Sequence, residues 1–195
     1  MTSALFERLR KSLNEAPLVE PIGGDDYCPE NERPVPAAVL IMITDRAEPG
    51  MLLTVRRDHL RAHAGQIAFA GGRMDPGEDS ISAALREARE EMGIEPQSVA
   101  IAGSLDPYHT VTGYLVTPVV ATVPPEVTVQ PNDMEVADWF EAPLDFLIDP
   151  AHHRQVTELL RGKTRTYYEI MWNGRRIWGV TAAMIVNLSR RLQWH

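Results

Sequence analysis

Short runs of apolar and β-branched residues, separated by turn-forming residues, dominate the middle of the chain. Such runs are typical of strands in a folded sheet. Near the C-terminus two further runs flank Asn173-Gly174, a pair that favours a two-residue hairpin turn because both turn positions need positive φ. Strands are therefore predicted at 37–44, 51–55, 67–70, 98–105, 114–123 and 135–140, with a hairpin over 166–178.

Three segments instead place apolar residues at the spacing of a helix. Leu5, Leu9 and Leu13 predict an amphipathic helix over 4–14. The last helix is predicted over 181–192, with Thr181 as its N-cap. Between them lies a helix over 80–92, whose predicted core-facing stripe consists of Ile81, Ala84, Leu85, Ala88 and Met92.

The order of these elements indicates the fold class. Strands outnumber helices, and the helices interrupt mixed strand runs instead of alternating strictly with strands. This order favours an α+β sandwich over a parallel doubly wound sheet. The length of 195 residues and the hydrophobic content of 44% suit one ordinary domain. We place this domain at 35–195 and expect 1–34 to form a helix and an extended arm that pack on it.

Net charge and the absence of leader-like segments limit the expected cellular location and the classes of binding partner. A formal charge of -8 argues against binding nucleic-acid or anionic-lipid backbones, which need a basic surface. No segment resembles a signal peptide or reaches the roughly 20 apolar residues of a membrane span. Cys28 is the single cysteine, so a reducing, cytoplasmic location is expected. A homodimer stays open, since residues 1–34 could cover the core, mediate dimerisation or shape the site.

Three glutamates on the helix over 80–92 are the first chemical signal. Glu87 and Glu91 lie one turn apart beside the apolar stripe, and Glu90 lies further round toward solvent. One interpretation is a solvated acidic face on which Arg86 pairs with Glu90. The context favours a metal site, because Gly71-Gly72 ends a strand and a polar loop leads directly into the helix. Mg²⁺ and Mn²⁺ take carboxylate, carbonyl and water oxygens, which this arrangement offers.

At 72–94 the segment GRMDPGEDSISAALREAREEMGI resembles the Nudix box. That box reads glycine, five residues, glutamate, seven residues, then Arg-Glu-apolar-x-Glu-Glu-x-Gly-apolar, and every defined position is filled here. The resemblance implies an α/β/α sandwich with a mixed central sheet and hydrolysis of a nucleoside diphosphate linked to another group. It also implies Mg²⁺ or Mn²⁺. The expected metal ligands are Glu87, Glu91, Glu90, Glu78 and, through its carbonyl, Gly72, with Arg86 holding one of the acids in position.

Hydrolysis also needs a general base within hydrogen-bond reach of the attacking water. In some Nudix enzymes the base comes from the box and in others from a distant loop. The candidates here are Glu90 and Glu135, with Asp133 third. Together with Arg86, Glu90 and Glu135 make up the expected catalytic group.

A second signal lies upstream, where Arg56, Arg57, His59, Arg61 and His63 gather within eight residues. A solvated basic turn is one interpretation. Because the stretch leads into the strand that opens the metal site, and because arginine forks suit phosphate oxygens, we expect substrate binding by Arg56, Arg57, Arg61 and Gly71.

Residues 52–72 also resemble the signature of coenzyme A pyrophosphatases, Leu-Leu-Thr-x-Arg-Ser-x₃-Arg-x₃-Gly-x-Val-x-Phe-Pro-Gly-Gly. Three positions depart from that signature: Arg57 replaces serine, Ile67 valine and Ala70 proline. The resemblance implies a small-molecule substrate, coenzyme A or a derivative, cut to 4′-phosphopantetheine and adenosine 3′,5′-bisphosphate.

Two alternatives to this reaction follow. The departures favour another nucleotide diphosphate, such as ADP-ribose or NADH. A binding module that does not cut its nucleotide would be expected to lack the metal-ligating glutamates, which are all present. The aromatic residues are candidates to stack adenine or, alternatively, to pack in the core; they are Tyr108, Trp139, Tyr167, Tyr168 and Trp178.

Overall fold

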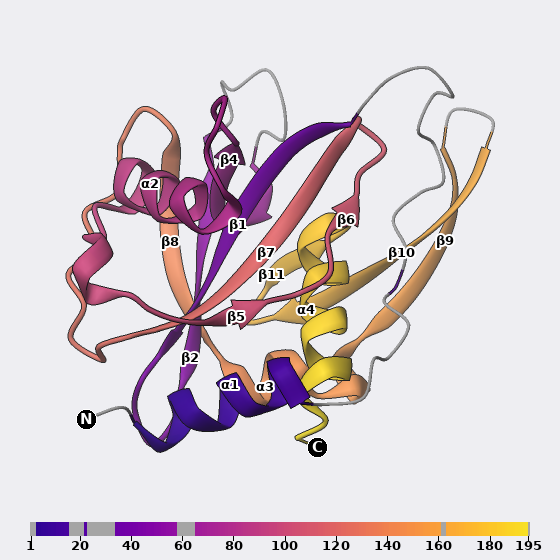
Figure 1. Ribbon diagram of the computed structural model, residues 1–195. Coiled ribbons are helices and arrows are strands. Elements are labelled where there is room, and N and C mark those ends of the chain that lie inside the picture. The colour runs from indigo at the N-terminus through magenta and orange to yellow at the C-terminus, as the bar shows by residue number, and fades with distance from the viewer. Residues whose placement is uncertain (1–2, 16–21, 23–33, 58–64, 161–162, 195) are drawn as a thin grey trace.

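The computed structural model describes residues 3–15, 22, 34–57, 65–160 and 163–194. Figure 1 shows a large sheet covered by helices on both faces and a smaller sheet to one side. The elements follow the chain as α1 (Ala4–Glu15), β1 (Val35–Thr44), β2 (Gly50–Arg56), β3 (Ile67–Ala68), β4 (Ala70–Arg73), α2 (Ser80–Met92), η1 (Pro96–Ser98), β5 (Ala100–Ser104), β6 (Tyr108–His109), β7 (Tyr114–Val123), β8 (Val136–Pro143), α3 (Leu144–Ile148), η2 (Pro150–His152), β9 (Arg154–Leu160), β10 (Lys163–Trp172), β11 (Arg175–Trp178) and α4 (Val180–Leu192).

The central sheet is mixed. Strands β3, β2, β1, β7 and β5 follow one another across it, β4 pairs with β1, β6 with β7 and β8 with β2. Its one parallel pair in the described chain joins β1 to β7 over ten residues each, from Val35–Tyr114 to Thr44–Val123. Strand β1 is apolar along nearly its whole length because helices cover both of its faces. The predicted α+β sandwich with a mixed sheet is confirmed.

Two apolar layers lie on opposite faces of this sheet. On one face, Leu40 and Met42 of β1 pack with Ala84 and Ala88 of α2. On the other face, Ile41 and Ile43 belong to the core that α1, α3 and α4 cover (Figure 1). The small residues of α2 let that helix lie close to the sheet, which brings its polar residues near the strand ends.

The N-terminal helix packs into the second of these layers. Leu9 and Leu13 of α1 are buried, and the ring of Trp194 stacks under the guanidinium of Arg8 at 3.9 Å. Helix α1 thus packs against the core of the central sheet. The remainder of the arm, including Cys28, lies almost wholly outside the described residues, and the division of the chain at residue 34 stays a prediction.

Several sequence predictions need correction. Thr181 is not the N-cap of α4; Gly179 is, and the Thr181 hydroxyl instead donates to the carbonyl of Ile67 at 3.0 Å. Ile81 does not face the core, since 39% of it is exposed and Ala83 is buried in its place. Strand β9, helix α3 and the short strand β6 were not foreseen. No helix in the described part of the chain combines the length and apolar character needed to cross a membrane.

In the smaller sheet, formed by β9, β10 and β11, one carboxylate lies between two arginines. Glu169 accepts from Arg154 Nε at 2.7 Å and from Arg176 Nε at 2.8 Å, and these two contacts lower the pKa of its carboxyl. A lowered pKa means that the contribution to stability is present above the ordinary value of 4.5 and is lost as the pH falls through the folded-state pKa.

We expect Glu169→Gln to lower Tm by about 2–4 °C at pH 7, because two arginines then face each other without a counter-charge. Below the lowered pKa the difference should vanish, since both side chains are then neutral. Thermal melts between pH 3 and pH 7 measure it. Glu126→Gln, on an exposed loop, serves as control. A Tm difference that persists at pH 3 would contradict this interpretation.

Candidate active site

Capping at both ends sets the position of α2. The side chain of Asp79 accepts from the backbone N–H of Ser82 at 2.7 Å, as an N-cap does. Gly93 ends the helix at φ 65°, and a Cβ there would come within 2.9 Å of Gln130. Gly93 is thus the C-cap of α2. The register of Glu87, Glu90 and Glu91 follows from these two fixed ends.

Glu91 is the most enclosed acid of the helix, with 3% of its surface exposed. One carboxylate oxygen accepts from the N–H of Gly71 at 3.2 Å, and the other lies 3.4 Å from Arg56 Nη1. Burial, together with the smaller effects of the charges of Glu87 and Glu135, raises the pKa of Glu91 to about 7 against these two attractions. A buried carboxylate that other carboxylates surround is suited to a cation.

Glu87 lies against Gly72, the next-to-last residue of β4. A Cβ on Gly72 would overlap the carboxylate of Glu87, so that only glycine allows this close approach. Burial raises the pKa of Glu87, Arg86 lowers it, and the charges of Glu90 and Glu135 raise it again. The Gly72–Glu87 contact joins β4 to the helix.

Arg86 connects the loop to the helix. Its guanidinium donates to both oxygens of Glu78 at 3.1 and 3.0 Å, to Glu87 at 2.8 Å and to the carbonyl of Arg73 at 3.0 Å. The hydrogen bond from Arg86 lowers the pKa of Glu78. Both oxygens of Glu78 are thus engaged, and Glu78 holds Arg86 in place here. Its expected role as a metal ligand stays a prediction.

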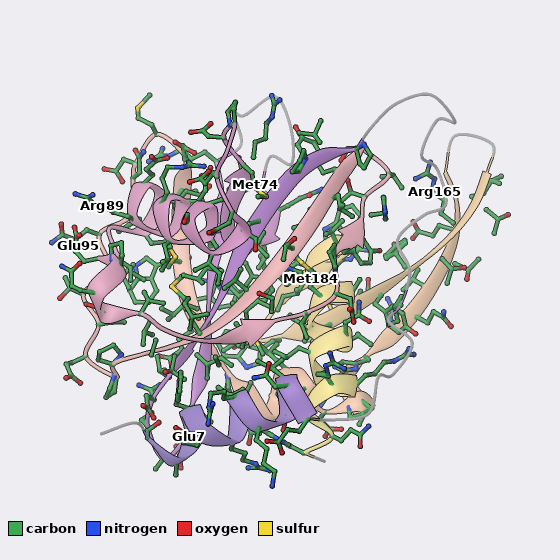
Figure 2. All side chains as sticks on the ribbon, in the orientation of Figure 1. Glu7, Met74, Arg89, Glu95, Arg165 and Met184 are labelled. Carbon is green, nitrogen blue, oxygen red and sulfur yellow. The ribbon has the colours of Figure 1, made fainter. Side chains whose placement is uncertain are left out.

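Glu90 lies toward solvent, with 55% of its side chain exposed and Arg86 Nη1 3.2 Å away. The outer side of α2 carries no site residues; there Arg89 pairs with Glu95 at 3.4 Å, and both project away from the sheet in Figure 2. The side chains of the helix therefore separate into an outer face, a partly exposed position at Glu90, and a sheet-facing pair at Glu87 and Glu91.

Glu135 reaches the same site from another part of the chain. The backbone N–H groups of Gln130 and Asn132 donate, each at 2.8 Å, to the carbonyls of Met92 and Glu91 at the end of α2. This docks the loop on the helix and places Glu135 near enough to raise the pKa of both Glu87 and Glu91. Asp133, the third candidate base, is 90% exposed and lies 3.8 Å from Arg57.

Arg56 and Arg57 carry the second notable feature. The Nε atom of each is buried and has no hydrogen-bond partner among the described residues. Buried donors without partners are rare in folded proteins and are satisfied by a bound anion or water. Arg61 lies outside the described residues, as do His59 and His63, so the expected substrate contact of Arg61 stays a prediction.

The site fits a hard cation by its chemistry. It combines two sheet-facing carboxylates, a neighbouring Glu135 and a glycine cradle that a Cβ would fill. Within the described residues, no three acidic, histidine or cysteine side chains are already grouped around one point. Arg86 and Arg56 supply the positive charge instead. Binding an ion through several of these acids therefore requires their carboxylates to turn away from the arginines.

We expect Gly72→Ala to lower kcat/KM about 10- to 100-fold, because the added Cβ displaces the Glu87 carboxylate. The backbone at Gly72 is not in the left-handed region, so the fold should tolerate alanine. Gly103→Ala makes the same chemical change away from the site, where the Cβ would meet only the Leu13 side chain at 3.3 Å. Equal activity of the two variants would contradict the cradle.

Comparisons with known proteins agree with this geometry. The NUDIX domain family matches residues 34–160. An uncharacterized Nudix hydrolase NudL of Shigella flexneri is 39% identical over 188 residues, covering 96% of this chain and 91% of its own. The protein of the same name from Yersinia pestis (strain Pestoides F) is 43% identical over 157 residues, covering 80% and 79%. The chain belongs to the Nudix family of hydrolases, enzymes that act on diphosphate anhydrides.

Solved structures agree on the fold. A MutT/nudix family protein from Enterococcus faecalis has a TM-score of 0.50 at 16% identity, over 97% of this chain and 73% of its own. The Nudix hydrolase RenU from M. smegmatis has a TM-score of 0.50 at 22% identity, over 57% and 71%. Nudix hydrolases generally use divalent metal ions such as Mg²⁺ or Mn²⁺, which suits the acids described above.

Proposed function

We propose that the protein hydrolyses the diphosphate linkage of coenzyme A or its derivatives, giving 4′-phosphopantetheine, or its acylated form, and adenosine 3′,5′-bisphosphate. The observation that carries this proposal is the pair of buried, unpartnered Nε donors on Arg56 and Arg57 beside Glu91. Coenzyme A bears a third phosphate outside the scissile linkage, and two unsatisfied guanidinium donors beside the diphosphate suit it.

The sequence around these arginines supports the same substrate. Leu52, Leu53, Thr54 and Arg56 occupy the positions of the coenzyme A pyrophosphatase signature, and so do Phe69, Gly71 and Gly72. Several of these residues have structural roles in the protein. Leu52 and Phe69 are buried, while the N–H of Gly71 holds Glu91. Arg56, although it pairs with Glu91, keeps a buried Nε without a partner among the described residues and can offer that donor to a ligand.

Each site residue has a proposed role. Glu87 and Glu91 hold Mg²⁺ or Mn²⁺ with help from Glu90 and the Gly72 carbonyl, and Arg86 orients Glu87. The bound ions would neutralise phosphoryl oxygens and lower the pKa of a water. Glu135 is the base we favour, because the loop that carries it docks on α2 beside the two buried acids. Glu90 is the other candidate, although Arg86 pairs with it.

A second candidate is another nucleotide diphosphate, such as ADP-ribose or NADH. Arg57 supports this second candidate, because the coenzyme A signature has serine at that position. The guanidinium of Arg57 lies 3.8 Å from the carboxylate of Asp133. The positive charge of Arg57 replaces a neutral hydroxyl group in contact with the ligand. Both substrates share a diphosphate and an adenine nucleotide, so the metal site serves either one.

Incubation of the full chain with coenzyme A and Mg²⁺ or Mn²⁺, followed by chromatography, tests the proposal. We expect adenosine 3′,5′-bisphosphate and 4′-phosphopantetheine, and no turnover with EDTA. ADP-ribose and NADH are assayed beside it, and kcat/KM ranks the three. Failure to cut coenzyme A at any metal concentration rules out the proposed substrate, and a higher kcat/KM for ADP-ribose favours the second candidate.

A further inference from the structure

We propose that Trp139 is the platform on which the adenine ring of the substrate stacks. The inference rests on the proposed hydrolysis of an adenine nucleotide diphosphate and names the part of the protein that recognises the base. Trp139 belongs to strand β8, which is separate in sequence from helix α2 with its glutamates and from the stretch that contains Arg56 and Arg57.

The register of β8 places Trp139 on the same sheet face as α2. Trp139 is directly opposite Thr54 of β2, and side chains directly opposite each other in an antiparallel pair share a face. Along β2, every second side chain points to the same face of the sheet. Leu52 packs in the α2 layer and Arg56 reaches Glu91 of α2, so Thr54, which lies between them, also points to the α2 face. Trp139 therefore stands on the face where the acids of α2 lie.

Trp139 is also close to the arginines along the strand. Arg56 follows Thr54 by two residues, a rise of about 7 Å. The pairing shifts between Val55 and Arg56, where β8 has one extra residue, and such bulges are frequent beside active sites. In a nucleotide whose diphosphate binds at α2, one ribose separates the base from the phosphates, and that separation is similar to the distance between Arg56 and Trp139 along the sheet. The position fits the nucleoside half of the substrate.

The ring of Trp139 is available to a ligand. It is 36% exposed, and among the described residues no aromatic ring, cation or hydrogen-bond partner meets it. The exposed large apolar residue that precedes it in the chain is Met134, 70% exposed and directly before Glu135. Strand β8 pairs only with β2 in the described chain, so it is an edge strand of the central sheet. An exposed indole ring beside charged phosphate-binding groups is a surface on which a nucleotide base can stack.

The other aromatic candidates are committed elsewhere. Tyr167 and Trp178 meet edge to face with centroids 5.6 Å apart, and the guanidinium of Arg176 lies 5.1 Å from the Trp178 ring. Tyr168 packs against the core, and Tyr108 already has an interaction partner. Trp139 is thus the candidate, within the described residues, that combines exposure with a free ring.

The test titrates adenosine 3′,5′-bisphosphate into the full chain, with and without Mg²⁺, by calorimetry and by indole fluorescence. We expect Trp139→Ala to raise Kd about 10- to 100-fold, as loss of one base–aromatic stack does. Trp139→Phe should stay within about 3-fold of the unaltered protein, because a phenyl ring also stacks. The fluorescence quenching on binding should be lost in Trp139→Phe, which a purely structural role would not cause.

Met171→Ala removes a comparably exposed apolar side chain from the smaller sheet and should leave Kd unchanged. Ribose 5-phosphate, which lacks a base, should bind Trp139→Ala and the unaltered protein equally. An unchanged Kd for Trp139→Ala overturns the platform, and so does a lack of binding by the unaltered chain. If coenzyme A is not cut but nucleotide binding still depends on Trp139, the proposed substrate fails and the platform stands.

Discussion

We expect Glu91→Gln to lower kcat/KM about 10²- to 10⁴-fold. A metal ion contributes several kcal/mol of transition-state stabilisation, and each 1.36 kcal/mol is a factor of ten in rate. The glutamine keeps the size and hydrogen-bonding reach of the side chain but removes the charge that holds a cation. Initial rates across a Mg²⁺ titration measure the effect, which excess metal should not fully restore.

The same substitution should not weaken the metal-free fold. Burial raises the pKa of Glu91 to about 7, so the ionised carboxylate is unfavourable in the folded protein, and this penalty grows as the pH rises from 4.5 through 7. A neutral amide avoids it, and Tm at pH 8 with EDTA should be equal or higher. Glu95→Gln, on the outer side of α2, is the matched control with unchanged kinetics. An active Glu91→Gln would undo the metal-site assignment.

The second large effect is expected for Arg86→Lys. A lysine keeps the charge but lacks the planar fork that meets Glu78, Glu87 and the Arg73 carbonyl at once. Loss of this support should lower kcat/KM about 10- to 100-fold, as loss of the groups that orient metal ligands does. Steady-state kinetics with a metal titration measure it, and the apparent affinity for Mg²⁺ should fall as well.

The control for Arg86→Lys lies three residues along the same helix. Arg89 pairs with Glu95 on the outer face, so Arg89→Lys makes the same substitution in the same helix without touching the site. We expect wild-type kinetics from Arg89→Lys. If the two lysine variants had equal kcat/KM, the guanidinium of Arg86 would have no special part in positioning Glu87.

Local signals in the sequence predicted the site helix and most strands well. The bounds of α2 agree with the prediction at 80–92, because Asp79 caps its start and Gly93 its end. The strand at 114–123 agrees as well, since its apolar run is long and bounded by turn residues. These elements are encoded by neighbours in the chain, which is why spacing alone finds them.

The failures arise where distant residues decide the structure. Thr181 has the chemistry of an N-cap, but its hydroxyl donates a hydrogen bond to the carbonyl of Ile67, 114 residues away. Strand β9 shows little apolar alternation, and its pairing with β10 defines it. The contact of Arg56 with Glu91 and the docking of the Glu135 loop on α2 likewise join segments far apart in sequence. Glu135 was named from its charge, but its place beside Glu91 comes from the fold.

The family match ends at residue 160, whereas the core does not. Ile170, Ile177 and Leu188 lie in the same buried cluster as Ile41 of the central sheet. A recombinant fragment cut at residue 160 would thus lose part of this buried cluster, expose the remainder to water and be prone to aggregate. For expression, domain swapping or fusion of this enzyme, α4 therefore has to stay with the central sheet.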